Sequence, residues 1–96
     1  MVLFSPNIFV FTTIMRFVQD IPHPHFRIGL YAWNSKYIVK IEAGLYEQTY
    51  KISEMDITEP DEVPAMLDDL FLERVANRFR DMDQDWQETG ERNGAL

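Results

Sequence analysis

His23 and His25 are the side chains of this sequence best suited to binding a metal ion, because two neighbouring imidazoles can share one ion. A stable zinc site needs a third and usually a fourth ligand, and the sequence has no cysteine and no further histidine. Pro22 and Pro24 hold the same stretch extended and remove two backbone donors. We therefore expect a stiff, exposed loop here, with no metal and no cofactor bound.

The carboxylates are the second group that could do chemistry. Asp81, Asp83 and Asp85 have the spacing that opens a calcium-binding loop, but such a loop needs glycine at its sixth position and glutamate at its twelfth. Those two positions hold Trp86 and Arg92. General acid–base catalysis needs carboxylates in a cleft that shifts their pKa values, whereas most of these are expected on a solvent-facing helix surface. With no nucleophile–histidine–acid set and no phosphate-binding glycine loop in the sequence, we expect a protein that is not an enzyme.

The third group combines aromatic and basic side chains, and whether it forms a surface depends on the fold. Six residues make it up: Arg27, Tyr31, Trp33, Lys36, Ile38 and Lys40. They lie in two β-favouring runs, 26–33 and 36–43, on either side of Asn34-Ser35. A two-residue turn there puts all six on one face of a hairpin, since side chains alternate along a strand. The opposite face then collects the apolar residues Phe26, Ile28, Leu30, Ala32, Tyr37, Val39, Ile41 and Ala43.

The cost of burying charge decides the register of this hairpin. With a two-residue turn, Trp33 lies opposite Lys36 and Arg27 lies opposite Glu42. A three-residue loop would instead place Lys36 and Lys40 among the core residues, which costs several kcal/mol. We therefore predict the two-residue turn.

A further strand follows a second tight turn, predicted at Ala43-Gly44 because glycine adopts the dihedral angles that such a turn requires. This turn pairs Ile41 with Tyr46. The core face of the strand then includes Gln48, which we expect near a sheet edge or hydrogen-bonded to a tyrosine hydroxyl. Together with a strand that covers at least residues 16–19, the prediction is an antiparallel β-meander of three to four strands.

One long amphipathic helix is predicted over residues 63–89. Its apolar residues recur at three- and four-residue spacing and so form one stripe: Val63, Met66, Leu67, Leu70, Phe71, Val75, Phe79, Met82 and Trp86. Gly90 is suited to a left-handed cap at its end. Because the sheet has an apolar face to cover, we predict an α+β fold with this C-terminal helix packed on one face.

The 96 residues are expected to form a single domain. Residues 16–52 are assigned to the meander, 53–62 to an acidic connector, 63–89 to the helix and 90–96 to a tail. Residues 1–14 are either a first strand or an N-terminal extension that precedes a native start at Met15. Their apolar run is far shorter than the roughly 20 residues that span a bilayer. The segment also lacks the basic start of a signal peptide, so we do not expect one.

The charge of the chain is unevenly distributed. The formal net charge is −7, with five Lys/Arg and three Asp/Glu in residues 1–52 but four and thirteen in residues 53–96. An acidic chain disfavours general binding to nucleic acids or to acidic membranes. The absence of cysteine fits a reducing compartment, so we expect a cytoplasmic protein.

Three functions fit these features. The first is self-association as a homodimer, or docking of a protein partner, through the face that carries the aromatic and basic residues. The second is a small-molecule pocket between helix and sheet, lined by Tyr37, Tyr46 and Tyr50. The third is a platform for single-stranded nucleic acid, which the net charge opposes. Alternatively, residues 8–18 fold over that face and close it.

Overall fold

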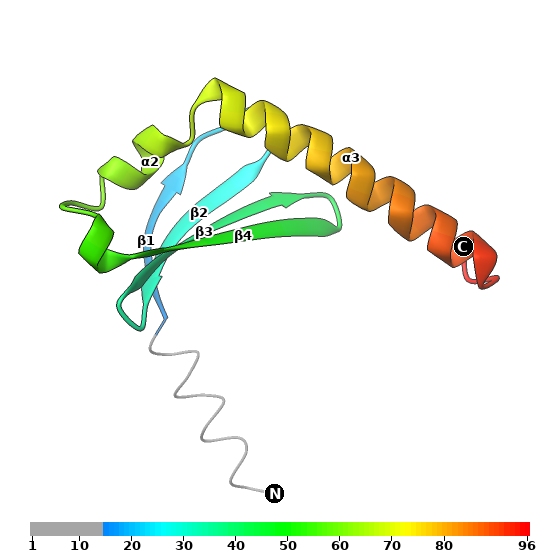
Figure 1. Ribbon diagram of the computed structural model, residues 1–96, viewed down its shortest axis with the longest axis horizontal. Helices are drawn as coiled ribbons and strands as arrows, with labels where there is room; N and C mark the ends of the chain where they lie inside the picture. The colour runs from blue at the N-terminus through cyan, green and yellow to red at the C-terminus, as the bar shows by residue number, and fades with distance from the viewer. Residues whose placement is uncertain (1–14) are drawn as a thin grey trace, which may run out of the picture.

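The computed structural model describes residues 15–96, which form one antiparallel sheet covered on one side by helices (Figure 1). The strands pair in the order β1-β2-β3-β4, with β1 at Arg16–Ile21, β2 at Arg27–Trp33, β3 at Lys36–Ala43 and β4 at Tyr46–Ser53. A 3-10 turn η1 (Glu54–Asp56) leads to helices α2 (Glu62–Met66) and α3 (Asp69–Arg92). The predicted α+β meander with a long C-terminal helix is confirmed. In this part of the chain, no helix has the length and apolar character needed to cross a membrane.

The β2–β3 turn has the predicted two residues. Asn34 and Ser35 both have positive φ, at 54° and 60°, as a type I′ turn requires. Trp33 pairs with Lys36 and Arg27 pairs with Glu42 across the two strands, so the predicted register is confirmed.

The β3–β4 turn was predicted one residue too early. It consists of Gly44 and Leu45, so that Ala43 pairs with Tyr46 and Ile41 with Gln48. Gly44 has a φ of 59° while Leu45 is not among the residues of positive φ, which matches a turn that takes glycine at its first central position. A turn at residues 43 and 44 would have forced positive φ on alanine. Because the pairing shifts by two residues, every side chain of β4 keeps its predicted face.

The core lies between the sheet and the two helices. Phe79 and Val75 of α3 pack with Val63 of α2 against the apolar side chains of β2 and β3, and the Phe79 ring lies 5.5 Å from the ring of Phe26. Its buried members are Ile28, Leu30, Val39, Ile41, Val63, Val75 and Phe79. The inner face of the hairpin is therefore the predicted one.

The predicted single helix is two helices, because the chain breaks at Leu67 and Asp68. Twelve residues separate Val63 from Val75, and at about 100° per residue a continuous helix would point them about 120° apart. The break allows both to be buried, at 2% and 0% exposure. Asp68 then caps α3, since its carboxylate accepts a hydrogen bond of 2.9 Å from the backbone N–H of Phe71.

The apolar stripe on α3 is rotated from its predicted position. Leu70 and Trp86 were assigned to the core but are 56% and 61% exposed, as is Met66 of α2 at 52%. Leu72 was left out of the stripe but packs against the core. Its spacing of three residues from Val75 fits the stripe, whereas Leu70 is five residues from Val75 and points away.

The end of α3 was also predicted too early. The helix continues through Gly90 to Arg92, and Gly94, with a φ of 70°, reverses the chain. The backbone N–H of Ala95 then donates to the Gly90 carbonyl at 2.8 Å. Leu96 folds back onto Gly90, where an added Cβ would collide with the Leu96 side chain. The last residues are thus a C-terminal cap and not the predicted free tail.

Polar contacts join the inner face of β4 to α3. The buried Gln48 amide donates to the Val75 carbonyl at 3.0 Å, and its oxygen accepts from the Tyr50 hydroxyl at 2.6 Å and from Arg78 at 3.1 Å. The Arg78 guanidinium also donates to the Tyr50 hydroxyl at 2.8 Å. One of the two placements expected for Gln48, beside a tyrosine hydroxyl, is confirmed. No polar side-chain atom that is buried in the described structure lacks a partner.

Candidate interaction surface

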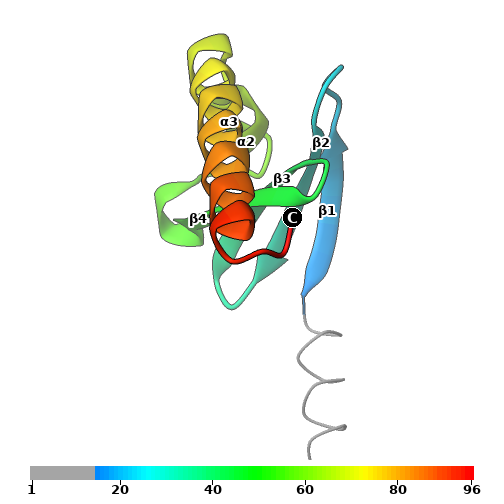
Figure 2. The same cartoon turned by 90° about the vertical axis from the view of Figure 1, so that its right-hand side faces the viewer.

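The outer face is the side of the sheet that points away from the helices (Figure 2). The strand pairing arranges its side chains in rows across the sheet. The central row contains Phe17, Tyr31, Ile38 and Lys51. On one side of it is a row of Trp33, Lys36 and Ser53. On the other side are a row of Asp20, Gly29, Lys40 and Thr49 and then a row of Arg27, Glu42 and Glu47. None of the elements described in residues 15–96 covers this face.

Tyr31 is at the centre of the outer face. Its ring leans over Gly29, where an added Cβ would lie 3.0 Å from a ring carbon, so glycine makes room for the ring. The Phe17 ring meets it edge-on at a centroid distance of 5.6 Å, and the Lys40 ammonium lies 5.2 Å from its centroid. The lysine is at a distance typical of a cation–π interaction. Gly29, Phe17 and Lys40 therefore hold the Tyr31 ring in place.

The structure brings the six predicted site residues onto this face but gives them different roles. Ile38 is 1% exposed, so a partner cannot contact it. Trp33 and Lys36 are partly exposed beside the β2–β3 turn, as is Lys40 in the row beyond Tyr31. Arg27 is exposed but lies opposite Glu42, in the row farthest from Trp33.

The sequence did not predict Phe17 on this face; Lys51 was predicted on the face but was not one of the six site residues. Phe17 is 54% exposed and extends the aromatic surface onto the edge strand β1. Lys51 adds a cation from β4. Strand pairing is what places both in the Tyr31 row, and pairing with β1 was not predicted residue by residue. We call Phe17, Tyr31, Trp33, Lys36, Lys40 and Lys51 the aromatic–basic patch.

The predicted cover over this face, residues 8–18, is described only from Met15 onward. Within that part, β1 pairs edge to edge with β2 and extends the sheet, so residues 16–18 do not lie over the face. The expectations for residues 1–14 fall outside the described part of the chain.

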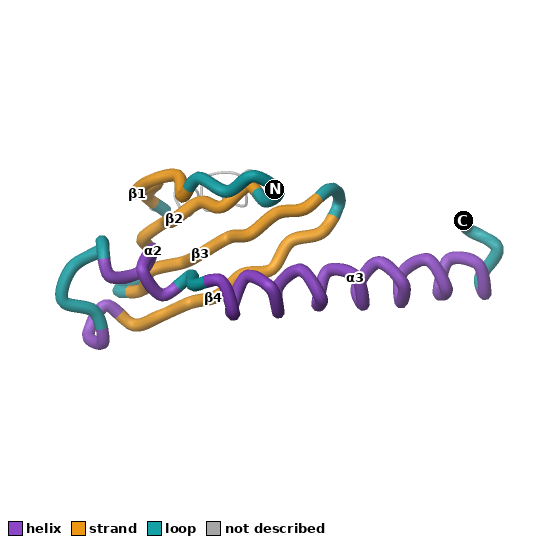
Figure 3. Tube along the Cα trace, turned by 90° about the horizontal axis from the view of Figure 1, so that it is seen from above, coloured by secondary structure: helices purple, strands orange, loops and turns teal. Residues whose placement is uncertain are grey.

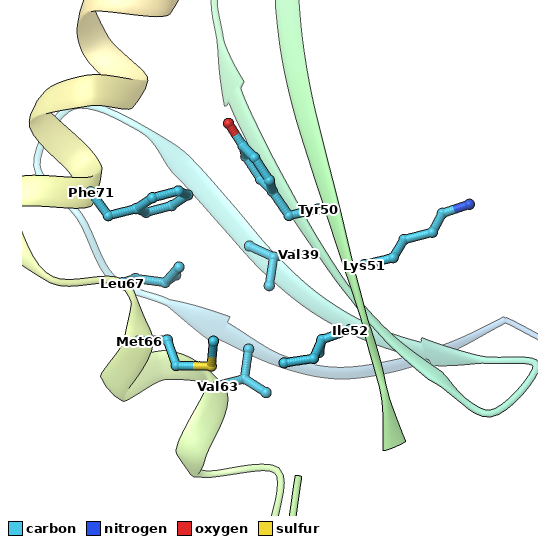
Figure 4. Close-up of a pocket in the computed structure, with 8 residues that line it drawn as sticks. All are labelled: Val39, Tyr50, Lys51, Ile52, Val63, Met66, Leu67 and Phe71. Carbon is cyan, nitrogen blue, oxygen red and sulfur yellow. The ribbon is translucent and has the colours of Figure 1, made fainter. Parts of the chain in front are cut away.

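A second candidate site lies between the helices and the sheet (Figure 4). It is an apolar pocket of about 230 Å³, lined by Val39, Tyr50, Lys51, Ile52, Val63, Met66, Leu67 and Phe71. The Lys51 side chain points away from it, which leaves the pocket lined by apolar groups and the Tyr50 ring. A pocket was predicted between helix and sheet, but Tyr37 and Tyr46 do not line this one.

A third candidate lies where α3 extends past the β3–β4 turn (Figures 1 and 3). We call it the overhang groove: a hollow of about 540 Å³ lined by Leu45, Tyr46, Met82, Asp85, Trp86 and Thr89. Leu45 is 97% exposed at the turn and faces no part of the core. Sequence reasoning missed this groove because it assigned Trp86 to the core and did not place Leu45 in the turn.

Tyr46 connects the overhang groove to the sheet. Its hydroxyl donates a hydrogen bond of 2.8 Å to the Asp83 carboxylate. This hydrogen bond raises the pKa of Tyr46 above its ordinary value of 10.0, and desolvation and the negative charge of Asp83 act in the same direction. The bond therefore holds the neutral phenol between β4 and α3 at neutral pH.

The loop that contains His23 and His25 is held in shape by contacts of the His23 ring. The Nδ1 atom of His23 accepts hydrogen bonds from the backbone N–H groups of His25 and Phe26, at 3.0 and 3.1 Å. The His23 ring stacks on Phe26 at a centroid distance of 4.7 Å. Within residues 15–96, no three side chains of the metal-binding types lie close enough together to hold an ion.

Comparisons of the chain with protein-family models, with curated proteins and with solved structures find no match.

Proposed function

We propose that this chain is a non-enzymatic protein-interaction module that self-associates through the aromatic–basic patch. The observation that carries the proposal is the outer face itself, where Phe17, Tyr31 and Trp33 lie beside three lysines on the side of the sheet away from the helices. Tyrosine and tryptophan are enriched at protein interfaces because they combine a large apolar area with a polar edge. The cysteine-free sequence supports a reducing compartment such as the cytoplasm.

Protein association explains the patch better than nucleic-acid binding. A single-strand platform combines aromatic stacking with a positive groove. Here the outer face also carries Asp20, Glu42 and Glu47, and the whole chain has a formal charge of −7. A phosphate backbone that runs across the whole face would therefore meet these carboxylates as well as the lysines of the patch.

Sedimentation equilibrium at several protein concentrations tests the proposal. The mean mass should rise with concentration, and Trp33→Ala should weaken the association by about 30-fold, equivalent to about 2 kcal/mol. Its free energy of unfolding should change by about 1 kcal/mol or less, since Trp33 lies outside the core cluster. Leu70→Ala is the matched control, because Leu70 is a 56% exposed apolar residue of α3, which lies on the opposite side of the sheet from the patch.

Two results would refute the proposal. One is a Trp33→Ala variant that associates normally but unfolds, which would place the tryptophan in the core. The other is tight binding of a single-stranded oligonucleotide that falls steeply between about 50 and 200 mM salt, which would identify the patch as a nucleic-acid platform.

The apolar pocket supports a second candidate function, the binding of a small apolar molecule. An engineered apolar cavity of about 150 Å³ holds benzene, so the 230 Å³ pocket has room for one substituted ring or indole. Indole should raise the melting temperature of the protein, and Val63→Phe should remove that shift by filling the pocket. An equal shift in both proteins would show that indole binds elsewhere.

A further inference from the structure

The overhang groove combines apolar surface with negative charge. Trp86 and Leu45 are 61% and 97% exposed, and Asp85 lies among the lining residues. We call residues 83–92 the helix extension. This extension carries Asp83, Asp85, Glu88 and Glu91 against the single cation Arg92. A partner of the groove must therefore bring apolar surface and positive charge together.

The aromatic–basic patch has that chemistry. Three aromatic side chains lie there with Lys36, Lys40 and Lys51. The patch is on the side of the sheet away from the helices, whereas the helix extension continues beyond the sheet on the helical side (Figures 1 and 2). One copy of the chain therefore cannot bring its own extension onto its own patch.

Charge decides how two copies can meet. If two patches face each other, lysines meet lysines, and if two helix extensions pair, carboxylates meet carboxylates. Like charges placed against each other destabilise an interface strongly. The pairing of one copy's helix extension with the other copy's patch brings opposite charges together and covers exposed aromatic side chains on both.

We propose that copies of this chain associate head to tail, with the overhang groove and helix extension of one copy docked on the aromatic–basic patch of the next. This inference rests on the proposed function, because it names the occupant of the same patch. The contact is heterologous, so a dimer of two copies still has one free patch and one free groove. Association should therefore continue past the dimer as concentration rises, unless a ring closes, and should weaken as salt screens the charges.

Two complementary variants of the full chain test the pairing. The first carries Lys36→Glu and Lys40→Glu, which inactivates the patch and leaves the helix extension intact. The second carries Trp86→Ser, which inactivates the groove and leaves the patch intact. Leu70→Ser is the matched control for the second, because Leu70 is a 56% exposed apolar residue of the same helix outside the groove. Circular dichroism verifies that each variant is folded.

In sedimentation equilibrium, each inactivated variant alone should associate at least about 30-fold more weakly than the native chain. Leu70→Ser should associate like the native chain. An equimolar mixture of the two inactivated variants can form one intact contact, so its mass should rise to that of a dimer and stop there. Since each variant supplies one functional surface to the mixture, this result cannot come from misfolded protein.

The other outcomes overturn the head-to-tail contact in distinguishable ways. If Trp86→Ser alone still forms dimers, two patches pair and the proposed function survives without this inference. If the Lys36→Glu, Lys40→Glu variant alone still forms dimers, two helix extensions pair and both proposals fail. If the native chain stays monomeric at every concentration, both fail as well.

Discussion

Leu70→Ala and Leu72→Ala should have opposite consequences, although the two residues are the same type and lie two positions apart on α3. Sequence periodicity had assigned Leu70 to the core and left out Leu72. In the structure Leu70 is 56% exposed, while Leu72 packs against the core cluster and lies beside the His23–Phe26 loop. The comparison of these two variants therefore measures the rotation of the helix about its own axis.

The expected magnitudes follow from burial. Truncation of a fully buried leucine to alanine costs about 3–5 kcal/mol, including the cavity that is left. Leu72 is only partly buried, so we expect Leu72→Ala to lower the free energy of unfolding by about 1.5–3 kcal/mol. Leu70→Ala removes little buried area, and alanine is slightly the better helix former. We therefore expect Leu70→Ala to change the free energy of unfolding by about 0.5 kcal/mol or less.

Urea denaturation followed by circular dichroism gives both free energies from the same type of curve. The urea dependence of the free energy should stay the same in the two variants, since neither alters the surface exposed on unfolding by much. Equal losses, or a larger loss for Leu70→Ala, would mean that α3 is rotated from the orientation described and would refute the reasoning.

Three further predictions concern other parts of the fold. Phe79→Ala should cost about 3–5 kcal/mol in urea denaturation, because Phe79 is 7% exposed; a loss below about 1 kcal/mol would place it on the surface. Ser35→Gly should raise the free energy of unfolding by up to about 1 kcal/mol, since Ser35 has a φ of 60°; Ser35→Ala, which keeps the strain, should not. Because the pKa of Tyr46 is raised on folding, its stabilising contribution is complete below pH 10 and is lost as the pH rises through the folded-state pKa. Denaturation curves at increasing alkaline pH should show this loss for the native chain but not for Tyr46→Phe, and equal pH dependence in both would contradict the role of the Asp83 bond.

The sheet could be predicted closely from the sequence because its determinants are local. Asn34-Ser35 lies between two alternating runs, and a wrong register would bury Lys36 and Lys40. At the second turn the local signal is Gly44. Whether glycine takes the first or the second central position decides the turn, and only the first position spares Ala43 from positive φ.

The helices were predicted less well because their placement depends on contacts distant in sequence. The break at Leu67-Asp68 follows from the need to bury Val63 and Val75 against one sheet, which periodicity within a single segment does not show. Arg78 was not expected to bond Gln48 and Tyr50, since this contact requires the angle at which α3 crosses β4. Four of the six patch residues could be predicted from the hairpin register, and the side-chain alternation of β4 places Lys51 on the same face. Phe17 required the pairing of β1 with β2.

The helix extension is supported differently from the rest of α3, and this difference bears on association. The core contacts of α3 end at Met82, and beyond it Asp83 and Gln87 interact with the Tyr46 side chain of β4. The rest of the extension is stabilised by contacts within the helix, such as Gln84 to Glu88 at 3.0 Å and Asn93 to the Thr89 carbonyl at 2.7 Å. Trp86 can therefore be changed without loss of core packing. Substitutions there should alter association and leave the free energy of unfolding nearly constant, whereas a tryptophan retained for stability would show the reverse.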